Sequence, residues 1–94
     1  MATEDDLMQL AALFEQAGAA HHDAFVHVNG DDPDWPWWYA GYVLDELRVL
    51  LGAQFTRSEL TYLFVLVDRE LKAEAPGASW TRYYSGFFAQ RYLI

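Results

Sequence analysis

Two short segments carry the residue types best suited to chemistry. A histidine pair, His21 and His22, follows the four small residues 17–20, and residues 35–39 hold three tryptophans and a tyrosine. Imidazole and phenol groups can transfer protons, and large rings can wall a space without filling it. We therefore predict a semi-buried pocket that admits a small ligand or ion. Its candidate residues are His21, His22, Trp37 and Tyr39.

His21 also has a purely structural interpretation. On a helix it lies one turn after Gly18 and one turn before Phe25, within the apolar stripe. A buried imidazole must form a hydrogen bond with a carboxylate or a carbonyl whether or not it has a function. The core histidine is the favoured interpretation at this point, and the pocket is the alternative.

The aromatic run at 35–39 also predicts an interface. Successive side chains on a helix are about 100° apart, so one core cannot bury all of these rings. Tryptophan and tyrosine supply much of the binding energy at protein contacts, and exposed aromatic patches are uncommon on monomers. The interface candidates, on the side away from the main apolar stripe, are Trp35, Trp38 and Tyr42. The alternative is that loops and the last helix cover both sides.

The sequence contains none of the common motifs for a metal or a cofactor. His27 lies on the opposite side of its helix from His21, and no Glu-x-x-His pair occurs. The acidic loop 31–34 lacks the glycine and the bidentate glutamate of an EF-hand, so we expect it to cap the following helix. The common hydrolase, nucleotide-binding and zincin motifs are also absent. We predict no metal and no cofactor, and catalytic residues remain unknown.

The elements that position these residues are all helical. Apolar residues recur at three- and four-residue spacings in four segments, with Thr56 and Glu59 forming a capping box and Ser79 a candidate cap. The predicted helices cover residues 4–28, about 35–51, 57–74 and 80–94. Because the connections are short, we expect an all-α fold of one domain over residues 1–94: a compact four-helix bundle or an orthogonal four-helix array.

Composition narrows the environment and the partners. Fourteen acidic residues against six basic ones give a net charge of −8, which disfavours nucleic acid and anionic membrane surfaces. No apolar run reaches the length of a membrane span, and the first residues lack the basic region of a secretory signal. The chain has no cysteine. We therefore expect a cytoplasmic protein.

Three segments carry a resemblance to a known family. They are the sequence from His21 to Phe25, residues 30–40 with the order Asp-Pro-Asp-Trp-Pro-Trp-Trp-Tyr-Ala, and residues 76–84 with Pro-Gly, Trp80 and a tyrosine pair. With these landmarks the chain resembles a family of small bacterial proteins of unassigned function. The resemblance implies a shared helical fold and carries no activity.

These observations favour a protein-interaction or oligomerising helical module, with a second copy or another protein as its partner. The alternative is a small-molecule-binding protein, or an enzyme, with its pocket at the histidine pair and the aromatic run. An acidic mimic of nucleic acid follows from charge alone and is the least favoured. A non-enzymatic role is the leading expectation.

Overall fold

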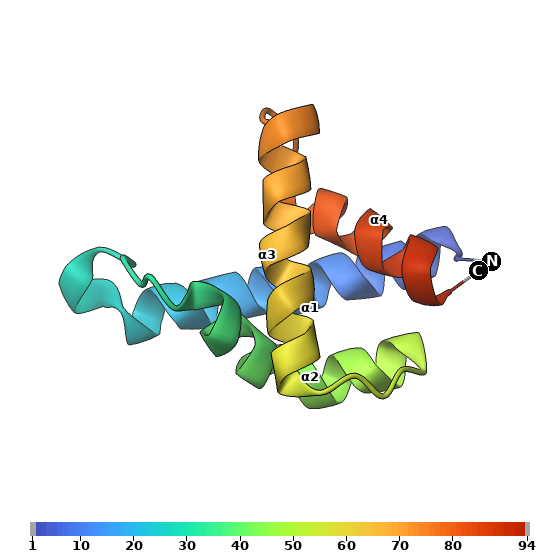
Figure 1. The fold of residues 1–94 in the computed structure, drawn as a ribbon, viewed down its shortest axis with the longest axis horizontal. Coiled ribbons are helices and arrows are strands. Elements are labelled where there is room, and N and C mark those ends of the chain that lie inside the picture. The colour runs from blue at the N-terminus through green and yellow to red at the C-terminus, as the bar shows by residue number, and fades with distance from the viewer. Residues whose placement is uncertain (1, 94) are drawn as a thin grey trace.

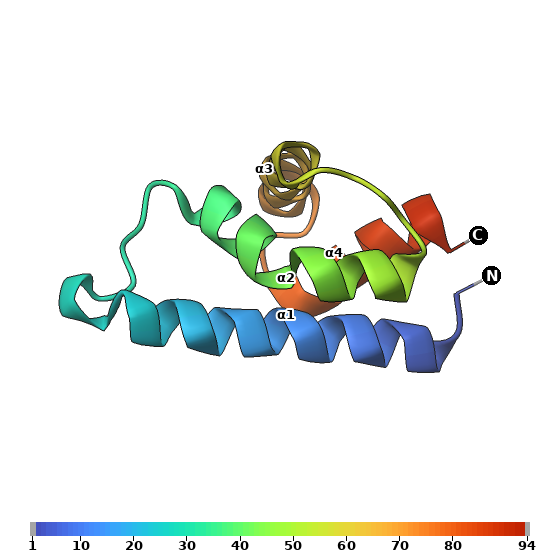
Figure 2. The same ribbon diagram turned by 90° about the horizontal axis from the view of Figure 1, so that it is seen from below.

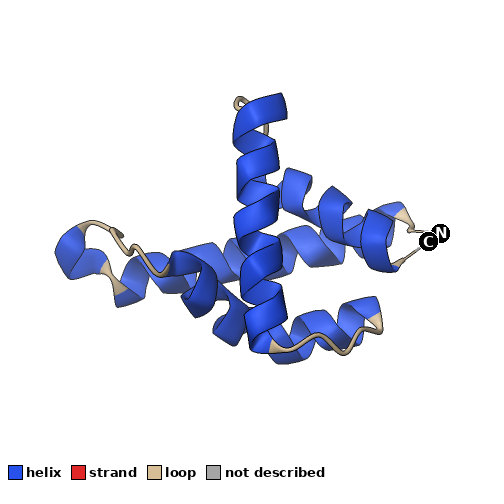
Figure 3. Ribbon diagram, in the orientation of Figure 1, coloured by secondary structure: helices blue, strands red, loops and turns tan. Residues whose placement is uncertain are grey.

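The computed structural model describes residues 2–93, and in this range it contains helices and no strand (Figure 3). The fold class is therefore all-α, as the periodicity predicts. The helices are α1 (Glu4–Ala24), the 3₁₀ turn η1 (Val26–Val28), α2 (Trp35–Leu51), α3 (Arg57–Glu74) and α4 (Trp80–Tyr92).

The helices form an array in which one member crosses the others. α1 runs along the length of the molecule, and α2 and α4 pack against it while running in the opposite direction (Figures 1 and 2). α3 crosses this layer steeply, so that Figure 2 shows it end on above α1. The orthogonal form of the predicted four-helix fold is the one observed.

α1 ends earlier than the apolar spacing predicts. The expected helix over 4–28 stops at Ala24, and the chain continues as the turn η1. Asn29 and Gly30 then adopt left-handed backbone conformations, and the Gly30 N–H donates to the Phe25 carbonyl over 2.8 Å. The two β-branched valines of η1 have low helix propensity, so little is lost when the helix opens there. This turn brings the acidic loop back over α1.

Helix caps confirm one prediction and correct two. Thr56 and Glu59 form the expected capping box at the start of α3. Ser79 precedes α4 but makes no capping hydrogen bond with its side chain, because its Oγ lies 3.1 Å from the hydroxyl of Thr81. The acidic loop does not cap α2 through the Asp34 side chain either. Its Asp32 is directed to another partner, described below.

Side chains from all four helices meet in one hydrophobic cluster. The larger side chains that are 0% exposed, here called the packed core, are Phe14, Val43, Leu47, Leu60, Val67 and Phe88. Phe14 contacts Phe64 and Phe88 edge-on or tilted, with ring centroids 5.8–6.1 Å apart. The core fixes the positions of the four helices relative to one another.

Among the described residues, no helix combines the length and apolar character needed to cross a membrane.

Candidate functional site

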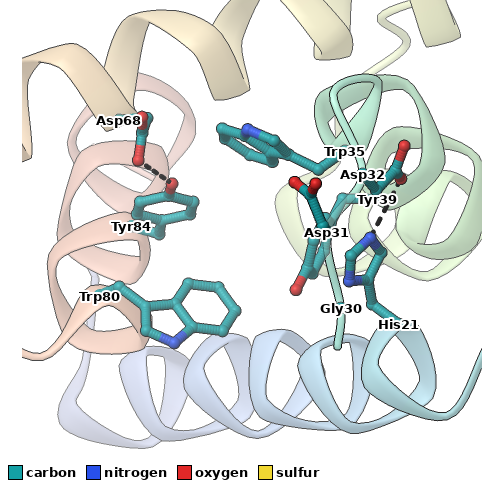
Figure 4. Close-up of a pocket in the computed structure, with 9 residues that line it drawn as sticks. All are labelled: His21, Gly30, Asp31, Asp32, Trp35, Tyr39, Asp68, Trp80 and Tyr84. Carbon is teal, nitrogen blue, oxygen red and sulfur yellow. Dashed lines mark hydrogen bonds and ion pairs between the residues drawn. The ribbon is translucent and has the colours of Figure 1, made fainter. Parts of the chain in front are cut away.

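A hollow of about 490 Å³ opens where the end of α1, the start of α2, the middle of α3 and the start of α4 meet. Figure 4 shows Asp68, Tyr84 and Trp80 facing the group of His21, Asp32 and Tyr39 across it. We call it the hollow. Its lining residues are His21, Gly30, Asp31, Asp32, Trp35, Tyr39, Asp68, Trp80 and Tyr84.

Four aromatic rings form its walls, each nearly perpendicular to the next. Trp35 and Tyr39 have ring centroids 5.9 Å apart at an interplanar angle of 83°. Tyr39 and Trp80 are 6.0 Å apart at 77°, and Trp80 and Tyr84 are 5.2 Å apart at 77°. Edge-to-face pairs of this kind are favourable because the edge of one ring is positive and the face of the other is negative. They also leave the rings as separate walls rather than one flat stack.

His21, a predicted pocket residue, pairs with the acidic loop. Nε2 of His21 lies 3.1 Å from Oδ2 of Asp32, and each side chain is only 9% exposed. An ionised carboxylate can only accept a hydrogen bond, so this geometry assigns the donated proton to Nε2. The other oxygen of Asp32 accepts from the Asp34 N–H over 3.0 Å. The Tyr39 ring stacks on the imidazole with centroids 5.0 Å apart.

A second polar pair lies on the opposite side of the hollow. The Tyr84 hydroxyl donates to Asp68 over 3.2 Å, and Lys72 Nζ lies 2.8 Å from the other carboxylate oxygen. Burial raises the pKa of the Tyr84 phenol, and the nearby charge of Asp68 raises that pKa further. Burial also raises the pKa of Tyr39. Both phenols therefore stay protonated at neutral pH and can donate hydrogen bonds.

Small residues of α1 make room for one wall. A Cβ atom placed on Gly18 would lie 3.1 Å from Trp80 Cζ2, closer than ordinary van der Waals contact, and 3.8 Å from the Tyr39 hydroxyl oxygen. The small residues 17–20 leave room for either close approach of a neighbour or an empty space. At Gly18 the outcome is close approach by Trp80.

The hollow carries negative charge. Three carboxylates line it, and its described lining includes no lysine or arginine. Asp32 is paired with His21 and Asp68 with Lys72, whereas the carboxylate of Asp31 forms no ion pair within residues 2–93. The hollow therefore suits a ligand that carries positive charge or hydrogen-bond donors.

The structure brings together two of the four pocket candidates. His21 and Tyr39 both line the hollow. His22 is exposed and lies outside the lining, although its Nδ1 would lie 3.8 Å from a Cβ atom placed on Gly30. Trp37 lies elsewhere: the Arg57 guanidinium sits 3.8 Å from the centre of its ring and donates to its carbonyl over 2.8 Å. Trp37 thus joins α2 to α3.

The three interface candidates do not share one exposed face of α2. Trp35 turns into the hollow. Trp38 and Tyr42 stack on each other, with centroids 5.3 Å apart and an interplanar angle of 11°. Trp38 is half-buried because its ring also meets His21 edge-on, and Tyr42 is 40% exposed. The expected outward face of α2 is therefore narrower than the sequence suggests.

Sequence reasoning missed part of the lining. Trp80 and Tyr84 were not among the pocket candidates, and the acidic loop that contains Asp32 was expected to cap α2. Their convergence depends on how α4 and the loop pack against α1, which no local spacing reveals. The available signal was the combination of a histidine on an apolar stripe with an acidic loop one turn beyond its helix.

Within the described residues, no group of three or more histidine, aspartate or glutamate side chains is arranged to hold a metal ion. Comparison of the chain with protein-family models, with curated proteins and with solved structures finds no match.

Proposed function

We propose that this protein binds a small organic molecule in the hollow. The observation that carries the proposal is the convergence of four ring walls and several polar side chains, contributed by all four helices and the acidic loop, around a space of about 490 Å³. Ligand sites are typically concave spaces of roughly 300–1,000 Å³ with apolar walls and a few polar groups. The hollow has this size and this composition.

The polar groups would orient the ligand. The Tyr39 hydroxyl forms no hydrogen bond with other residues in the range 2–93, and the Asp31 carboxylate forms no ion pair there. Both are available to a ligand without breaking an existing contact. Hydrogen bonds to groups that are already in place cost little reorganisation, which favours affinity.

The four tryptophans provide a direct test. Trp35 and Trp80 line the hollow, whereas Trp37 packs under Arg57 and lies outside it. In a fragment screen by NMR, we expect binders to shift the indole N–H signals of Trp35 and Trp80 and to leave that of Trp37 in place. If no fragment shifts the first two signals at millimolar concentration, the hollow is not a ligand site. If all the signals shift together, binding is non-specific.

A second candidate function is self-association through α2. Trp38, Tyr42 and Val49 share one side of this helix, and Val49 is 81% exposed. An exposed ring and an exposed aliphatic residue on one side of a helix are typical of contact surfaces. Light scattering over a concentration series tests the idea with Tyr42→Ser, which should lower the mass of an oligomer. The control is Tyr62→Ser at a 65% exposed position on α3. A monomeric mass at high micromolar concentration would contradict self-association.

A further inference from the structure

We propose that the ligand of the hollow is an organic cation that carries an alkylated ammonium group. This inference rests on the proposed function and specifies its ligand class. It combines the ring geometry, the charge of the lining and the pairing of its carboxylates.

The ring walls suit a cation. The negative face of an aromatic ring attracts a positive charge located within about 6 Å of the ring centroid, and tryptophan is the strongest of the side chains that do so. The hollow offers two tryptophans and two tyrosines in a chain of near-perpendicular pairs, at 83°, 77° and 77°. Walls at right angles can surround one rounded group from several sides, which a flat stack cannot.

The charge of the lining selects the sign of the ligand. An anion would face three carboxylates without a lysine or arginine among the described lining residues. Asp31 is the carboxylate that no ion pair neutralises within residues 2–93. The net charge of −8 adds a field that attracts cations to the whole molecule. A cation in the hollow would therefore gain attraction from Asp31 and from the ring faces together.

The wall chemistry and the existing pairs of the carboxylates favour an alkylated group over a metal ion or a bare ammonium. Hard metal ions require several oxygen ligands at once, and no set of three acidic or histidine side chains in the described range is arranged to supply them. A primary ammonium also needs acceptors for its three N–H groups. Methyl groups on nitrogen spread the charge over an apolar surface, which matches aromatic walls, and the carboxylates of Asp32 and Asp68 are already engaged by His21 and Lys72.

The decisive comparison uses choline and its uncharged carbon isostere, in which a tert-butyl group replaces the trimethylammonium group. The two molecules have nearly the same shape, so their difference in affinity reports charge. With Kd measured from the Trp35 and Trp80 indole shifts, we expect choline to bind about tenfold more tightly than the isostere. The anion tert-butylacetate should bind more weakly than either.

The outcomes separate this inference from the proposed function. Equal binding of choline and the isostere would leave the hollow as a small-molecule site and overturn the cation assignment. Tighter binding of the anion would overturn it as well. If neither these probes nor any fragment of the screen shifts the two indole signals, the proposed function fails and the inference fails with it.

Two variants test the named contacts. Asp31→Asn removes the charge at an exposed loop position, and Trp35→Leu removes a ring face while keeping apolar bulk. Each should weaken choline binding by about five- to tenfold and change binding of the isostere much less. The matched controls are Asp45→Asn and Tyr62→Leu, at exposed positions outside the hollow. Amide chemical shifts show that each variant is folded. Equal losses for choline and isostere in both variants would contradict a cation site.

The trimethylammonium group occurs in free molecules and on methylated lysine side chains. A third probe, a short peptide containing trimethyllysine, distinguishes these sources from each other. Affinity for choline equal to or greater than that for the peptide supports a free small molecule as the ligand. Peptide binding at least about tenfold tighter than choline would overturn the small-molecule assignment, because contacts outside the hollow would then supply most of the affinity.

Discussion

The packed core and the hollow are built from the same four helices but use their large side chains differently. Phe14 and Phe88 of the core are 0% exposed, and Leu47 and Val67 beside them are equally buried. In the hollow, Trp35, Tyr39 and Trp80 remain half-buried. The core fills its space with side chains that have no polar atoms. The hollow is surrounded by rings that end in a hydroxyl or carry an indole N–H.

This difference has a physical cause. Phenylalanine loses nothing when water is removed from all sides, whereas tyrosine and tryptophan must find a partner for their polar atom or keep it near water. His21 and Tyr84 satisfy this need with the carboxylates of Asp32 and Asp68. A hydrogen-bonded pair holds both of its side chains in place, so they do not move to fill a neighbouring space. The aromatic side chains of the hollow therefore surround a space, whereas the apolar side chains of the packed core fill theirs.

The largest effect on stability is expected from a substitution in the packed core. Leu47→Ala should lower the free energy of unfolding by about 2–5 kcal/mol, because Leu47 is 0% exposed and its removal leaves a cavity. Alanine suits a helix interior, so the loss reports packing. Denaturant titration measures it, with Tyr62→Ala at an exposed position as a control expected to change stability by less than about 0.5 kcal/mol.

The same variant tests whether the two regions are separable. Below its unfolding transition, Leu47→Ala should keep the indole N–H shifts of Trp35 and Trp80, because both rings are only partly buried and pack against the outside of the core. Large shifts of both signals would mean that the hollow depends on core packing, and the comparison between the regions would not hold.

A smaller effect is expected from the polar pair at the hollow. Asp32→Ala leaves the Nε2–H group of a buried His21 without its acceptor, which costs about 1–3 kcal/mol of stability. Asp31→Ala, one residue earlier and exposed, should change stability by less than about 0.5 kcal/mol. Thermal or chemical denaturation measures both. Equal effects of the two substitutions would show that the His21–Asp32 contact does not stabilise the fold.

The fold was largely predictable from the sequence because it depends on local patterns. Three- and four-residue spacing located the helices, and the Thr56 capping box marked the start of α3 correctly. The error at the end of α1 arose because Phe25 and Val28 continue the apolar spacing beyond the point where the backbone leaves the helix. Periodicity reports which face is apolar and does not report where hydrogen bonding changes.

The site was predictable only in part because it depends on contacts between distant segments. His21 and Tyr39 could be grouped because helix and loop lengths bring the first two helices together. Trp80 and Asp68 come from α4 and α3, and their positions follow from the crossing of α3 over the layer (Figure 1). Trp37 was misplaced for the same reason: its partner, Arg57, lies 20 residues further along the chain.

The third expected effect concerns the cap of α3, a helix that contributes to both regions. The Thr56 hydroxyl accepts a hydrogen bond from the Glu59 N–H over 3.1 Å. Thr56→Ala should lower stability by about 1 kcal/mol, as expected for loss of a capping side chain. Thr56→Ser keeps the hydroxyl and should restore most of the loss. An unchanged denaturation midpoint for Thr56→Ala would mean that this cap does not stabilise the helix.

The smallest effect is a pH dependence from the same cap. The Glu59 carboxylate accepts from the Thr56 N–H over 2.9 Å, and this hydrogen bond lowers the pKa of Glu59 below its ordinary value of 4.5. A carboxyl group whose pKa is lower in the folded state stabilises the fold above its ordinary pKa, and this contribution is lost as the pH falls through the lowered pKa.

Glu59→Gln keeps an acceptor but removes the charge. The wild type should therefore be more stable than Glu59→Gln at neutral pH, and the difference should shrink toward zero as the pH falls below 4.5. Denaturation at a series of pH values measures this difference, and Glu46→Gln, at an exposed position in α2, shows what removal of a surface charge does without a cap. A difference that stays constant down to low pH would show that Glu59 stabilises α3 by some means other than its charged hydrogen bond to Thr56.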